Sequence, residues 1–202
     1  MENLILTHLN GGSSMALKKL PYKRLQHLVG VHLSTKEWAS TQKVMNELAG
    51  AKKRGYLTKA ELVKVCRWKS ARAIKQIRRN HSDTIKKITK TAFATRSEQT
   101  KLSLLTDLYG VSVPMASAVL MLTNPKRYGV IDIRVWQLLH KMGSVKTNAD
   151  GVGFHFKQWY RYLTILRYFA KKYGVGARDI ERTLFTVHTI FQKGRVYNTV
   201  AD

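Results

Sequence analysis

One carboxylate in this chain, Asp132, has a type and a position that could do chemistry. It directly precedes residues 133–136, Ile-Arg-Val-Trp, which have the pattern of a helix start. Backbone N–H groups at a helix N-terminus would keep this carboxylate ionised and fixed in direction. Such an anion can stabilise a cationic sugar transition state or activate a water molecule. Taken alone, an Asp at this position is more often an N-cap than a catalyst.

A tight turn at residues 108–114, Leu-Tyr-Gly-Val-Ser-Val-Pro, joins two apolar helical patterns upstream of this acid. Gly110 can adopt a positive φ without a steric penalty. Ser112 can cap the second helix, and Pro114 is tolerated in its first turn. Such a hairpin directs unpaired backbone N–H groups outward, which makes a phosphate-binding surface without basic side chains. For these residues alone, an ordinary helix–helix corner is the commoner explanation.

The hairpin and the acid together resemble the helix-hairpin-helix DNA glycosylase superfamily. In that family a hairpin of the form L-x-G-(V/I)-G-x-x-x-A precedes a catalytic Asp in an apolar-Asp-x-x-apolar context. The acid here follows Gly110 by 22 residues, as the family's layout requires. The match is clear over residues 101–142 and weaker on either side. The matching residues are Leu108, Gly110, Val111, Ala116 and Asp132.

Two departures from the family pattern matter. Ser112 replaces the second hairpin glycine, which narrows the allowed backbone but keeps a capping side chain. Pro114 occupies the position where bifunctional members carry a lysine that forms a Schiff base with the sugar. The resemblance therefore implies a monofunctional glycosylase that leaves an abasic site, with Asp132 as the catalytic residue. A substitute lysine elsewhere, such as Lys126 or Lys141, stays open.

The resemblance also implies how DNA is held. A stacked base must be flipped out of the duplex, so the protein needs phosphate contacts and a wedge or aromatic wall. Each tryptophan could instead be a core residue with no contact to DNA. The expected DNA-binding residues are Gly110, Val111, Ser112, Val113, Lys69, Arg72 and Arg134, and the expected wedge or pocket residues are Trp68, Tyr109, Trp136 and Trp38.

The charge balance points to a polyanionic partner. Among 202 residues, 36 Lys and Arg stand against 12 Asp and Glu, giving a net charge of +24. A basic stretch around residues 67–79 is expected to supply phosphate contacts. A single cysteine, Cys66, argues against a disulfide framework, a multi-cysteine zinc site and an iron–sulfur cluster. No metal is expected, and no cofactor beyond a monovalent cation at the hairpin. His188, on an apolar helix face, is expected to be a hydrogen-bonded core residue.

The expected fold is all-α, with two helical subdomains flanking a DNA-binding cleft and containing the helix-hairpin-helix motif. Residues 1–35 would pack with the C-terminal half, residues 36–124 would end in the hairpin, and residues 128–202 would carry Asp132. No strand pair is expected. The expected helices cover residues 34–48, 58–66, 71–79, 83–93, 97–108, 133–142, 154–173 and 177–192, with a further one after the hairpin.

Two classes of function remain. The first is a DNA glycosylase acting on a repair lesion or on a hypermodified base of phage DNA, as an antiviral defence. The second is a non-enzymatic helix-hairpin-helix nucleic-acid-binding protein, for which an acid in a phosphate-rich groove would be unfavourable. A ribosome-associated or membrane-surface protein would explain the charge but not the hairpin. We expect a cytoplasmic, nucleoid-associated monomer that binds double-stranded DNA and no membrane; no transmembrane helix is expected.

Overall fold

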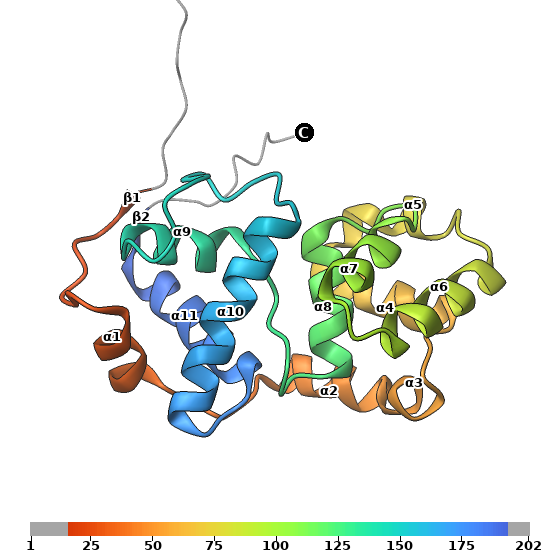
Figure 1. Ribbon diagram of the computed structural model, residues 1–202, viewed down its shortest axis with the longest axis horizontal. Helices are drawn as coiled ribbons and strands as arrows, with labels where there is room; N and C mark the ends of the chain where they lie inside the picture. Colours follow the sequence, from red (N-terminus) through yellow and green to blue (C-terminus); the bar gives the residue numbers. More distant parts are fainter. Residues whose placement is uncertain (1–15, 194–202) are drawn as a thin grey trace, which may run out of the picture.

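The structure, a computed structural model, describes residues 16–193. It is mostly helical, as the sequence predicts (Figure 1). None of the helices in this part of the chain is long and apolar enough to cross a membrane. The helices are α1 (Leu25–His32), α2 (Ala39–Glu47), α3 (Ala49–Arg54), α4 (Lys59–Ser70), α5 (Ile74–Ile77), α6 (Ser82–Ala94), α7 (Glu98–Thr106), α8 (Val113–Thr123), α9 (Ile133–Lys141), α10 (Phe156–Tyr173) and α11 (Ala177–Phe191), with a 3-10 helix η1 (Ala71–Ala73) before α5.

The sequence did not predict the strand pair between β1 (Ala16–Leu17) and β2 (Gln192–Lys193). The two strands are antiparallel, with Leu17 opposite Gln192. Two residues on each side are too few to produce a recognisable alternation of apolar and polar side chains. The pairing therefore depends on the helices that bring the two segments together.

Helix α8 lies at the centre of the fold, and residues 115–123 are all buried. It packs against α4 and α7, and α2 and α3 also contact it. In a second group of helices, α11 packs against α10, α9 and α1. Figure 1 shows the two groups side by side, with the segment between α8 and α9 running between them. A helix that is apolar on all sides suits this central position.

The capping signal at the start of α4 is confirmed. Thr58 Oγ1 accepts a hydrogen bond from the Glu61 backbone N–H at 3.3 Å. The Glu61 carboxylate in turn accepts one from the Thr58 backbone N–H at 2.8 Å. These two bonds satisfy N–H groups that the first turn of a helix leaves without a partner.

The similar signal at Ser34 and Glu37 gave a wrong helix start, because α2 begins only at Ala39. Glu37 instead accepts hydrogen bonds from Arg178 at 2.8 Å and Arg182 at 2.9 Å, both on α11. Its carboxylate therefore pairs with α11 and does not cap the start of a helix at Ser34. Tertiary ion pairs have overridden a local capping pattern here.

The chain turns sharply at the end of α4. The sequence predicted a helix over residues 71–79, but the structure contains η1 followed by the single-turn helix α5. Ser70 has φ −167° and ψ 96°, an extended conformation that stops α4 from continuing. This corner places residues 69–73 beside the turn between α7 and α8.

Candidate active site and nucleic-acid interface

A cleft of about 1010 Å³ lies between four segments of the chain. It contains most of the residues that the sequence selects for chemistry or DNA contact. Its walls bring together segments that lie far apart in the sequence, including the hairpin and the acid. The cleft is lined by Lys69, Ser70, Arg72 and Ala73, by residues 106–115, by Asp132 and Ile133, and by residues 151–154.

The turn between α7 and α8, residues 107–112, is fixed by close packing against α5. Gly110 has φ +78°, and a Cβ atom there would lie 2.8 Å from the Cβ of Gln76 and 3.1 Å from the backbone nitrogen of Ile77. Glycine is therefore required both for its conformation and for its lack of a side chain. The Asn80 side chain completes the attachment: it accepts from the Tyr109 backbone N–H at 2.9 Å and donates to the Tyr109 carbonyl at 3.0 Å.

Helix α8 begins inside this cleft. Ser112 occupies the N-cap position in an extended conformation, but its side chain makes no capping hydrogen bond. The expectation that Ser112 caps the helix through its hydroxyl is therefore wrong. Pro114 follows in the first turn, where it has no N–H to satisfy. The first-turn N–H groups of Val113 and Met115, both at the cleft, are consequently not capped by Ser112.

Asp132 is the N-cap of α9, as predicted, and only 8% of its surface is exposed. Its Oδ1 accepts a hydrogen bond from the Arg134 backbone N–H at 3.0 Å. Its Oδ2 accepts one from Lys69 Nζ at 2.8 Å. Burial on its own would raise the pKa of Asp132, but Lys69 and the Arg134 N–H lower it below its ordinary value. The carboxylate is therefore ionised at neutral pH.

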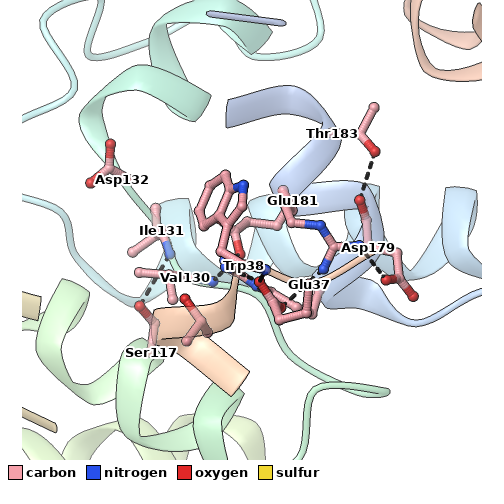
Figure 2. A network of polar contacts seen from close by, with 12 residues as sticks. Glu37, Trp38, Ser117, Val130, Ile131, Asp132, Asp179, Glu181 and Thr183 are labelled. Atoms are coloured by element: carbon pink, nitrogen blue, oxygen red, sulfur yellow. Dashed lines mark hydrogen bonds and ion pairs between the residues drawn. The ribbon is translucent and has the colours of Figure 1, made fainter. Parts of the chain in front are cut away.

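The segment that leads to Asp132 is held on both sides. The Ile131 backbone N–H donates to Ser117 Oγ of α8 at 3.1 Å, and the Tyr162 hydroxyl of α10 donates to the Val130 carbonyl at 2.8 Å. A Cβ atom at Gly129 would lie 2.5 Å from the Leu166 side chain, so the backbone approaches α10 closely. Figure 2 shows Asp132 at the end of this segment, directed away from the neighbouring ion pairs of Glu37 and Glu181.

Five further predicted residues also line the cleft. Tyr109 is 56% exposed, and the Arg79 guanidinium lies 4.7 Å from its ring centre. An exposed aromatic ring on the hairpin has the geometry that a wedge needs. The five residues are Lys69, Arg72, Tyr109, Val111 and Val113.

Three of the predicted aromatic residues and one arginine do not line the cleft. Trp136 is buried and donates to the Asn148 carbonyl at 2.8 Å, while Trp68 donates to Thr41 Oγ1 at 3.2 Å. Trp38 packs against Phe185 and beneath the Arg178 guanidinium. The Arg134 side chain lies over the Phe185 ring, so only its backbone N–H reaches Asp132.

Two contributions to the cleft were missed by the sequence reasoning. Phe154 lines the cleft and packs edge-on against Trp136, with ring centres 5.4 Å apart. Lys69 was predicted to contact DNA, but its ion pair with Asp132 was not foreseen. Local sequence patterns cannot predict a contact between residues 63 positions apart. Phe154, by contrast, follows the glycines of a loop and could have been named as a candidate aromatic residue of the cleft.

Basic side chains surround the corner at the end of α4. They are exposed, and none forms an ion pair with an acid of the described part of the chain. Unpaired exposed cations attract phosphate groups. The residues are Arg67, Arg72, Lys75, Arg78 and Arg79.

His188 of α11 is fully buried near Asp132 and Arg134. The expectation of satisfied hydrogen bonds is wrong, because neither ring nitrogen has a partner among the described residues. Burial, with the Arg134 charge adding to it, lowers the pKa of His188 to about 4. The ring is therefore neutral at pH 7.

Comparison of the chain with protein-family models, curated proteins and solved structures found no match. Within residues 16–193, no group of three or more His, Cys, Asp or Glu side chains is arranged to hold a metal ion. The single cysteine, Cys66, is buried and contacts the Ser70 carbonyl through its sulfur at 3.3 Å. Functional interpretation therefore depends on the cleft itself.

Proposed function

We propose that the protein is a DNA glycosylase of the helix-hairpin-helix type that releases a damaged or modified base and uses Asp132 as its catalytic carboxylate. The observation that carries this proposal is the position of Asp132. It is a nearly buried, ionised carboxylate in the same cleft as the uncapped N-terminus of α8. A protein that only binds phosphates gains nothing from a fixed negative charge at this place.

We assign a separate role in DNA binding to each part of the cleft. The N–H groups at the start of α8 and the exposed cations near α5 hold the phosphates on either side of the target nucleotide. Tyr109 enters the stack when the base is flipped out. This arrangement would bring the sugar of the flipped nucleotide to Asp132.

Asp132 would then act on the sugar as its bond to the base breaks. The C1′–N bond breaks with its electrons going to the base, and positive charge develops on the sugar. An ionised carboxylate fixed in a partly dry site stabilises that charge without reorganising. Water then adds to C1′, its proton is lost to solvent, and an abasic site results.

The substitution Asp132→Asn tests this proposal. Asparagine can still accept the Arg134 N–H and cap α9, but it carries no charge. We expect base release to fall by about 100-fold or more, while binding to duplex DNA is retained. Asp83→Asn removes an equal charge from an exposed position in the first turn of α6, outside the cleft, and should leave base release unchanged.

The substrate panel should contain oxidised, alkylated and deaminated bases and phage genomes with substituted cytosines, and abasic sites should be counted with an aldehyde-reactive probe. The panel separates the two candidate roles, repair of a lesion and attack on hypermodified phage DNA. The alternative function, a binding protein without activity, predicts that no substrate gives abasic sites and that both variants bind as the wild type does. That result would end the enzymatic proposal.

A further inference from the structure

The ion pair between Lys69 and Asp132 places a primary amine at the candidate catalytic carboxylate. Lys69 Nζ lies 2.8 Å from Asp132 Oδ2, and the two side chains are 18% and 10% exposed. The amine is thus partly shielded from solvent but open to the cleft. Lys69 lies in the last turn of α4, directly before the corner at Ser70.

Among the described residues that line the cleft, Lys69 alone carries a primary amine. Arg72 is also present, but a guanidinium stays protonated and is a poor nucleophile. The two lysines left open by the sequence lie elsewhere. Lys126 is exposed beside Gly176, and Lys141 is exposed at the end of α9.

We propose that Lys69 is an amine nucleophile that forms an imine with C1′ of an abasic site held in this cleft, which gives the protein a strand-cleaving lyase activity. The inference rests on the proposed function only in requiring that the cleft accept an abasic sugar. It differs from the expectation from the sequence, in which Pro114 in the hairpin implied a monofunctional enzyme and Lys126 or Lys141 was named as a possible substitute.

The chemistry balances without a further reactant. The Lys69 ammonium loses a proton to water, and the free amine adds to the C1′ aldehyde of the open sugar. The carbinolamine then takes up a proton from water, loses its oxygen as water and leaves a protonated imine. One ammonium and one aldehyde thus give one iminium ion and one water.

Strand cleavage follows from the iminium ion. This cation acidifies the C2′ hydrogen, which is lost as a proton to solvent. The C3′–O bond then breaks, and its electrons leave with the phosphate of the downstream strand. Water releases the sugar fragment from Lys69 and restores the amine.

The contact between Lys69 and Asp132 could also have a role without covalent chemistry, and that role predicts different experimental results. If Lys69 served only to orient Asp132 or to bind a phosphate, its positive charge would matter and its nucleophilicity would not. The substitution Lys69→Arg separates these roles, because arginine keeps the charge and the hydrogen-bonding reach but cannot form a stable imine.

The experiment uses duplex DNA in which a defined abasic site has been made beforehand, incubated with the protein in the presence of borohydride. Borohydride reduces an imine to a stable amine, so an adduct appears on a denaturing gel. We expect an adduct with the wild-type protein, at least a 10-fold loss in Lys69→Arg, and binding of the abasic duplex within about threefold of wild type. Lys126→Arg and Lys141→Arg should trap as the wild type does.

Peptide mapping of the wild-type adduct by mass spectrometry identifies the modified lysine without any substitution, so the test does not depend on a variant that folds. An adduct located at another lysine, an equal adduct in Lys69→Arg, or no adduct from wild-type protein that binds the abasic duplex would each overturn the inference. Because the abasic site is made beforehand, trapping at Lys69 together with no base release from any DNA would instead refute the proposed base release alone.

Discussion

Asp132 combines a local contact with a contact to a distant part of the chain. One carboxylate oxygen caps α9 and the other contacts Lys69 from a different part of the chain. Its pKa is lowered, so the contact stabilises the folded protein above the pKa of the unfolded chain and is lost as the pH falls. The capping role could be predicted from the sequence because it involves adjacent residues. The lysine partner could not.

His188 gives a prediction at the same scale. Its folded pKa of about 4 lies below the ordinary value of 6.5, so the unfolded chain takes up the proton first as the pH falls. The contribution of His188 to the free energy of unfolding is fully present above pH ~6.5. It declines by about 1.4 kcal/mol per pH unit below that, up to about 3 kcal/mol near pH 4. His188→Leu should remove this decline, and it should also raise stability at pH 7, because two unpartnered ring nitrogens leave the core.

Urea unfolding at pH 7.5 and at pH 5 measures this effect. His81→Leu, at an exposed position, is the control and should keep the wild-type difference between the two pH values. If His188→Leu keeps that difference too, another group is responsible for it.

At the scale of elements, the start of α8 depends on Gly110. Gly110 and Gly55 both have φ +78°, but nothing lies within 4 Å of a Cβ at Gly55. Gly55→Ala should therefore cost only about 1 kcal/mol for the left-handed conformation. Gly110→Ala should cost about 1 to 3 kcal/mol more, because its Cβ meets Gln76 and the Ile77 backbone.

Paired denaturation curves of the two variants give this difference directly. Fluorescence anisotropy with a labelled duplex should also show weaker DNA binding for Gly110→Ala alone, because a displaced turn moves the N–H groups at the start of α8. Equal costs for the two alanines would mean that the turn is not tightly packed against α5.

The elements themselves were largely predictable. Helix periodicity and the Thr58 capping box depend on neighbouring residues, and α4, α6, α10 and α11 lie close to their expected positions. The start of α2 was not predictable, because Glu37 is drawn to α11. The interruption between the helices expected at residues 58–66 and 71–79 is present, but α4 extends to Ser70 before it.

At the scale of the whole molecule, a buried ion-pair network ties the segment before α2 to α11 (Figure 2). Glu37 contacts Arg178 and Arg182, and Arg178 also contacts Glu181. Burial raises the pKa of Glu181, although Arg178 opposes this. The network joins the two groups of helices without covering the cleft.

Removal of Glu37 should destabilise the whole fold. Breaking a buried ion pair typically costs about 3 to 5 kcal/mol, and Glu37→Ala should cost about 2 to 3, because Asp179 and Glu181 still neutralise the two arginines. Glu47→Gln breaks the exposed pair with Lys64 and should have no measurable effect. Thermal unfolding of the three proteins at neutral pH checks this. A similar melting temperature for all three would show that the network contributes little.

The contact between α1 and α11 has a consequence for the order of events on the ribosome. Helix α1 is made before the other described helices, whereas α11, against which it packs, is the last of them. The helices that surround α8 are complete by residue 123 and can assemble while translation continues. Helix α1 must wait for its partner, so the group of helices that carries Asp132 can close only after α11 has been made.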